Sequence, residues 1–149
     1  MTAAAADALP PIPHAGPARL VTRVVRWDAS EIVCEGRIPA PGPWVRDGRC
    51  PAFVLLELAA QAAAALDALQ ASATSRGSAG ERLAAGPGSI VRVRDLGLSR
   101  PTVAPGRLLR AQVTRGAAAP PLFLFAVRVD DDGGQELMRA ELALHIVRR

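Results

Sequence analysis

Several residue types are scarce or missing in this chain of 149 residues, and each absence excludes some classes of protein. Lysine, asparagine and tyrosine are absent, so all 18 basic residues are arginine. The two tryptophans and three phenylalanines are too few to form a platform for stacking bases. The arginines are scattered singly and match no DNA- or RNA-binding motif, although the net charge is +4. We therefore expect no nucleic-acid partner.

Cysteine and histidine are also rare, with two of each. Two cysteines in a chain of this length do not form a disulfide framework, which fits a reducing cytoplasm. Their spacing from the histidines is not that of metal ligands, so no metal site is expected. No uncharged apolar run reaches about 18 residues, and the first residues lack the basic region of a signal peptide. The sequence predicts a cytoplasmic protein without a membrane span.

Apolar residues are abundant and make up 50% of the chain, whereas charged residues make up 21%. This balance and length are typical of one globular domain, and we assign residues 1–149 to a single domain. Residues 1–13, rich in alanine and proline, are expected to form a flexible N-terminal arm. Residues 74–88, rich in glycine and serine, are expected to form a flexible connection.

Strand patterns lie at both ends of the domain. Residues 19–27 and 31–38 are rich in β-branched residues and are joined by a short polar turn, which predicts a hairpin. Four more strands follow residue 88, with a bulge expected near Asp95 and a hairpin turn at 130–134. Their expected ranges are 88–100, 107–115, 122–129 and 136–147. The order of elements predicts an antiparallel sheet.

One long helix is predicted from Pro51 to Ala73. Proline suits the first helical position, and the run that follows contains no internal glycine or proline. Glu57 and Asp67 are its only charged residues, so the helix lacks a polar stripe and should be enclosed. A sheet wrapped around it gives an α+β fold of about six strands. One helix covers such a sheet poorly, so we expect oligomerisation through the sheet edges.

Few residues are candidates for chemistry. Glu57 is placed by the helix among apolar neighbours, where it is either a general acid oriented by Gln61 at i+4 or an ordinary exposed glutamate. His14 lies in the arm, and His145 falls on the outward phase of the last strand. Cys50 precedes the predicted helix, whose dipole would lower the pKa of its thiol, although a structural cysteine is the preferred reading.

Three segments together resemble a known family. PHAGPARLVTRVV is similar to the PH-x-x-P-M-L-L-x-D-R-V start of the β-hydroxyacyl-acyl-carrier-protein dehydratases. CPAFVLLELAAQAAAAL is similar to their P-G-V-L-x-x-E-A-x-A-Q helix, with Glu57 and Gln61 in register. VRDGRCPA most resembles the R-D-G-R-L-P-A of a divergent, aryl-polyene-associated branch, the ApeP-like proteins. The resemblance covers residues 12–70 well and rests on strand order after residue 88.

The resemblance implies a hotdog fold, in which an antiparallel sheet wraps a central helix and two hotdogs pair edge to edge. It implies an acyl thioester substrate, held on an acyl carrier protein or coenzyme A, and a cofactor-free dehydration. In typical members a histidine before the helix removes the α-proton, while the acidic residue of the helix helps the β-hydroxyl leave as water. Backbone amides at the helix start polarise the thioester carbonyl.

The usual catalytic histidine is missing, since residues 36–50 contain none. His14 matches the family's other, non-catalytic histidine, and it remains a candidate replacement base. Three readings stay open: a dehydratase-like subunit with weak or no activity beside an active homologue, a thioesterase using Glu57, and a non-enzymatic binding module for acyl chains or carrier proteins. The partner hotdog would be a second copy or a homologue. The expected substrate-binding residues are Gln61, Trp44, Cys50 and Phe53, and the expected carrier-docking residues are Arg46 and Arg49.

Overall fold

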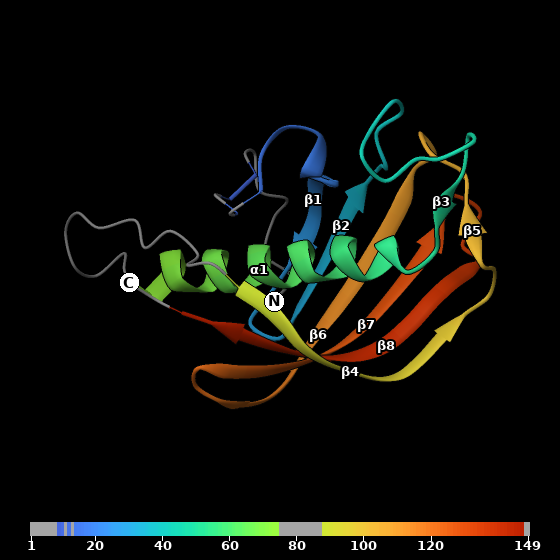
Figure 1. Cartoon of the computed structure of the whole chain (residues 1–149). Helices are drawn as coiled ribbons and strands as arrows, with labels where there is room; N and C mark the ends of the chain where they lie inside the picture. The colour runs from blue at the N-terminus through green and yellow to red at the C-terminus, as the bar shows by residue number, and fades with distance from the viewer. Residues whose placement is uncertain (1–8, 11, 13, 75–87, 148–149) are drawn as a thin grey trace.

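A six-stranded antiparallel sheet curves around one long helix (Figure 1). The computed structural model describes residues 9, 10, 12, 14–74 and 88–147. In spatial order the strands are β1 (Val21–Trp27), β2 (Glu31–Gly36), β6 (Leu109–Ala119), β7 (Leu122–Asp131), β8 (Glu136–Ile146) and β4 (Gly88–Leu98). The helix is α1 (Val54–Thr74), and the 3₁₀ turn η1 (Gly16–Ala18) precedes β1. This is the hotdog arrangement that the resemblance implies.

The predicted strands are confirmed, with small shifts at their ends. β1 and β2 form the expected hairpin, while β6 runs on to Ala119, four residues past its predicted end. The register of β4 against β8 slips between Arg94 and Gly97, where Asp95 has a φ of 52°. That slip is the bulge expected near Asp95. Inward-facing residues of β8 are buried as the alternation predicted: Met138, Ala140, Leu142, Leu144 and Ile146.

The start of the helix differs from the prediction. Cys50 and Pro51 form the short strand β3 (Cys50–Pro51), which pairs with β5 (Thr102–Val103). The backbone N–H of Ala52 donates to the carbonyl of Pro101 at 2.9 Å. These pairings across the chain hold Pro51 in extended conformation, so α1 begins only at Val54. Sequence alone could not reveal the partner strand that competes with the first helical turn.

The helix is enclosed, as its composition predicted. Twelve of its residues are buried, and it packs against β1, β2, β6, β7 and β8. By length and hydropathy α1 could cross a bilayer, yet 67% of the relevant window is buried inside the protein. Burial of this kind is typical of a core helix, because the protein's own sheet takes the place that lipid would occupy. α1 is therefore the central helix of the fold.

Two polar side chains of α1 are buried together with its apolar residues, and both are hydrogen-bonded. Gln61 is fully buried, and Asp67 is 2% exposed. A guanidinium N–H of Arg115 on β6 donates to Asp67 at 3.3 Å, and the same guanidinium stacks over the rings of Phe123 and Phe125. The arginine compensates a carboxylate that would otherwise be costly to bury.

The sheet approaches the helix closely at Gly36, the last residue of β2. A Cβ added there would lie 2.6 Å from Cδ1 of Leu58 and 2.7 Å from the carbonyl oxygen of Leu20. The second of these contacts is with backbone, which cannot rotate away. Glycine at this position therefore lets the helix and the first hairpin pack at their observed distance.

We predict that Gly36→Ala lowers the free energy of unfolding by about 1–3 kcal/mol, because overpacking displaces Leu58 and the Leu20 backbone. Urea denaturation followed by circular dichroism measures the change. Gly97→Ala is the matched control, since no atom lies within 4 Å of a Cβ added at this strand glycine. Equal stability of the Gly36 variant and wild type would contradict the close-approach argument.

Two sequence predictions concern segments that are largely not described. Most of the predicted arm, residues 1–8, 11 and 13, lies outside the described residues. Residues 75–87 of the predicted connection at 74–88 also lie outside the described residues. Both remain predictions.

Candidate active site

His14 and Glu57 meet at the first turn of α1. Nε2 of His14 lies 2.7 Å from Oε1 of Glu57, which is within hydrogen-bonding distance. The two side chains are 30% and 27% exposed, so the pair is partly shielded from solvent but still accessible. The two residues are far apart in the sequence, with His14 in the segment before η1 and Glu57 on α1. The fold thus creates an imidazole–carboxylate pair, which is a common unit of acid–base catalysis.

Gln61 joins Glu57 to the segment before β1. Its side-chain amide nitrogen donates to Oε1 of Glu57 at 3.1 Å and to the carbonyl of Ala18 at 2.8 Å. Its Oε1 accepts from the backbone N–H groups of Leu20 and Val21, at 2.8 and 3.3 Å. Gln61 thus contacts Glu57 from position i+4, as predicted. The same side chain also holds the backbone of the segment that connects His14 to β1.

The backbone between His14 and β1 makes a tight turn. Gly16 has a φ of 59°, which an L-residue rarely adopts, and η1 follows at once. The other ring nitrogen of His14, Nδ1, is buried and has no hydrogen-bond partner among the described residues. Nε2, already shared with Glu57, is therefore the ring atom placed to exchange a proton.

The predicted substrate-binding residues lie in different environments. Phe53 immediately precedes α1, one turn before Glu57, and is 59% exposed. Trp44 is partly buried against the core, and its indole N–H has no partner among the described residues. Phe53 is thus the aromatic residue nearest in sequence to Glu57 of the His14–Glu57 pair, which we call the dyad. A bound molecule could cover its exposed ring.

Cys50 corrects the expectation of a lowered thiol pKa. The cysteine lies in β3 and not at the helix start, and its side chain is buried. Burial raises the pKa of the Cys50 thiol, because it disfavours the thiolate. Burial likewise raises the pKa of Cys34, on β2, to about 12. The geometry supports the structural reading of Cys50 given above.

We predict that neither thiol reacts with a cysteine-specific reagent in the folded protein at neutral pH, because the thiolate is the reactive form. Labelling followed by mass spectrometry measures modification, with urea-unfolded protein as the positive control. Rapid modification of Cys50 in the native protein would show that this side chain is accessible and ionised, against the structure.

Arg46 and Arg49 flank a tight hairpin in the loop before β3. Each backbone N–H donates to the other residue's carbonyl, at 2.9 and 3.0 Å. Between them, Asp47 and Gly48 have φ values of 50° and 71°, which are typical of a two-residue hairpin turn. Both arginines are exposed, and Nε of Arg49 donates to Thr102 at 2.8 Å. The fold therefore presents two positive charges on an ordered turn.

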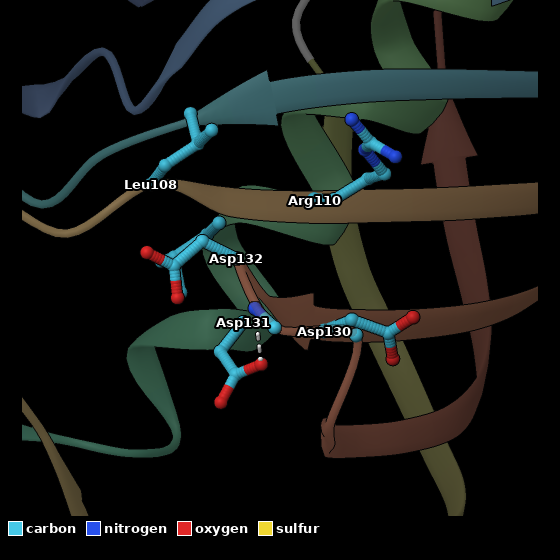
Figure 2. A pocket seen from close by; sticks show the side chains of 8 residues that line it. Leu108, Arg110, Asp130, Asp131 and Asp132 are labelled. Carbon is cyan, nitrogen blue, oxygen red and sulfur yellow. Dashed lines mark hydrogen bonds between the residues drawn. The ribbon is translucent and has the colours of Figure 1, made fainter.

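A pocket of about 300 Å³ lies elsewhere, beside the β7–β8 turn (Figure 2). Its lining includes Asp130, Asp131 and Asp132, within the stretch predicted as a hairpin turn. Oδ1 of Asp131 accepts the backbone N–H groups of Gly133 and Gln135, so this carboxylate stabilises the turn. Among the described residues, no three histidine, cysteine or acidic side chains are placed to share a metal ion.

The sequence profile of the ApeP-like dehydratases matches residues 7–146, nearly the whole chain. The chain belongs to the ApeP-like dehydratase family. This confirms the family recognised in the opening segment and the helix. No curated protein sequence matches the ApeP-like chain.

Solved structures agree with this fold. The dehydratase heterocomplex ApeI:P from Xenorhabdus doucetiae matches with a TM-score of 0.79 and 18% identity, covering 91% of this chain and 88% of the other. A mutant thioesterase from Pseudomonas aeruginosa matches at 0.59 and 12%, covering 85% and 81%. The PaaI protein of the E. coli phenylacetic acid degradation operon matches at 0.56 and 14%, covering 83% and 78%. At these identities the matches establish the hotdog fold of the ApeP-like chain.

Proposed function

We propose that this ApeP-like protein dehydrates 3-hydroxyacyl chains that an acyl carrier protein delivers as thioesters, in the cytoplasm and in a dimer with a second hotdog subunit. The observation that carries the proposal is the 2.7 Å contact between His14 and Glu57. In this proposal His14 takes the role of the histidine that the family normally places before the helix. The absence of histidine from residues 36–50 then removes the usual base without removing acid–base chemistry.

The reaction needs one group to accept a proton and another to release one. When the substrate enters between the two side chains and replaces their direct contact, Nε2 of His14 accepts the proton from C2, and the carboxyl of Glu57 gives its proton to the hydroxyl leaving C3. The C3–O bond breaks, a C2–C3 double bond forms, and water departs, so the dyad ends with the same number of protons. Imidazole suits the accepting role because it gains and loses a proton near neutral pH.

The position of the dyad favours the negative charge that develops on the thioester. Glu57 lies in the first turn of α1, beside the end of the helix where the dipole is positive. Dipoles already oriented toward the thioester oxygen stabilise an enolate without reorganising during the reaction. Gln61 holds the carboxylate in place through a fully buried amide, which keeps the acid in one orientation.

Glu57 lies on a face of α1 that the protein's own sheet leaves partly uncovered. Phe53 is exposed, and Leu56, Glu57, Ala60 and Ala64 are only partly buried. These positions follow helical spacing, so they share one face. A second hotdog covering this face would exclude water and enclose an acyl chain. The heterocomplex described for the Xenorhabdus doucetiae protein supports a homologous subunit as that partner.

We predict that His14→Ala and Glu57→Gln each reduce dehydration by about 100-fold or more, because acid–base groups that act as a unit each carry most of the rate. The assay follows the enoyl product formed from a 3-hydroxyacyl thioester of a pantetheine analogue. His145→Ala is the control, since that histidine is on β8 and is no part of the dyad.

The products distinguish the three readings. Enoyl thioester that depends on both dyad residues supports the proposal. Release of free thiol that depends on Glu57 alone would indicate thioester hydrolysis. Tight binding without turnover, unchanged in the His14 variant, would leave a binding module and contradict catalysis by the dyad.

We also propose that Arg46 and Arg49 dock the acidic carrier protein beside the start of α1. We predict that Arg46→Ala together with Arg49→Ala weakens carrier binding at low salt by about tenfold, mainly through slower association. Surface plasmon resonance at two salt concentrations measures both rates. The control is Arg128→Ala with Arg139→Ala, two arginines engaged in ion pairs on β7 and β8. Unchanged binding by the Arg46 and Arg49 variant would refute docking at this hairpin.

A further inference from the structure

The face of α1 that carries Glu57 changes character toward the C-terminal end of the helix. Four residues follow one another on this face at helical spacing and are exposed or only partly buried: Phe53, Glu57, Ala60 and Ala64. The next residue in the same series is Asp67, whose side chain is 2% exposed. The partly uncovered part of this face, which we call the Glu57 face, therefore ends at Asp67.

Arg115 of β6 holds Asp67 at this end of the face. β6 and β7 lie against α1 as one hairpin (Figure 1), and a guanidinium N–H of Arg115 donates to Oδ1 of Asp67 at 3.3 Å. Cζ of Arg115 lies 5.6 and 5.8 Å from the ring centroids of Phe123 and Phe125. Its backbone N–H donates to the carbonyl of Ser30 at 2.7 Å. The guanidinium is thus fixed between a carboxylate and two aromatic rings, which favours one side-chain position.

The ion pair is well separated from the dyad along the helix. Asp67 follows Glu57 by ten residues, so it lies about 15 Å further along the helix axis. An extended carbon chain advances about 1.2 Å per bond, so this distance corresponds to about twelve bonds. A longer chain on this face would have to separate Arg115 from Asp67. That separation is costly, because it leaves the buried carboxylate without its arginine.

We propose that the ion pair between Asp67 and Arg115 ends the acyl-binding part of the Glu57 face and so limits the length of the acyl chain. The inference rests on the proposed function, in which the acyl chain starts at the dyad and lies along this face. It adds the class of chain accepted, an apolar tail that extends about twelve bonds beyond the dyad. The pair does not touch the reacting atoms, so it determines specificity and not the chemical step.

Binding of saturated acyl thioesters of pantetheine tests this limit. We expect the affinity of the full-length protein to rise by up to about fourfold per added methylene and to stop rising about twelve bonds beyond the dyad. In D67A/R115A, which removes both partners of the ion pair, the affinity should continue to rise. A chain four carbons beyond the wild-type limit should bind this variant at least tenfold more tightly than wild type. Isothermal titration calorimetry measures the dissociation constants.

Two further variants make the result decisive. Ala64→Leu places bulk on the Glu57 face about 4.5 Å before Asp67, so it should shorten the limit by about four bonds. This change leaves the ion pair intact and tests the limit even if D67A/R115A does not fold. R128A/D130A removes an ion pair of β7 whose arginine is 45% exposed, and it should keep the wild-type limit.

Wild-type affinity that keeps rising past about twelve bonds, or that does not depend on chain length, would overturn the proposal. A limit that neither D67A/R115A nor Ala64→Leu moves would overturn it as well. Saturated chains carry no 3-hydroxyl and cannot be dehydrated, so the limit is measured independently of the dyad. A limit that moves as expected in a protein without dehydratase activity would refute the proposed reaction and support the role of the ion pair.

Discussion

The fully buried amide of Gln61 is the interaction on which the site depends. It is bonded to the carboxylate of Glu57, to the carbonyl of Ala18 and to the N–H groups of Leu20 and Val21. One side chain of the central helix thus satisfies backbone groups where the chain enters the sheet. Buried polar groups are costly when unpaired, so this network ties the position of the His14 segment to the position of the helix.

The second constraint is the number of helices. A single helix fills the concave side of six strands, but one of its faces remains partly uncovered, and Glu57 lies on that face. Among the described residues, the edge strands of this sheet are β1 and β4. In the proposed dimer, a second subunit covers the partly uncovered helix face. In that proposal, the partner subunit completes the enclosure of the site.

Much of the fold could be predicted from the residues themselves. The alternation of Met138, Ala140 and Leu142 predicted a half-buried strand, and the scarcity of charge after Pro51 predicted an enclosed helix. The exact start of the helix could not be predicted, because it depends on a pairing between Cys50 and Val103 that are far apart in the sequence. The error in the expected thiol pKa of Cys50 has the same origin, since the helix dipole was placed where a strand lies.

The site, too, has one contact that the sequence predicts and one that only the tertiary structure sets. The spacing of Glu57 and Gln61 on one helix face fixed their contact, because residues four apart in a helix are neighbours. The contact of His14 with Glu57 was decided only by tertiary structure. A turn at Gly16 and the hydrogen bonds of Gln61 hold the two residues together. No local pattern in the sequence encodes this distance, because the two segments meet only when the sheet closes around the helix.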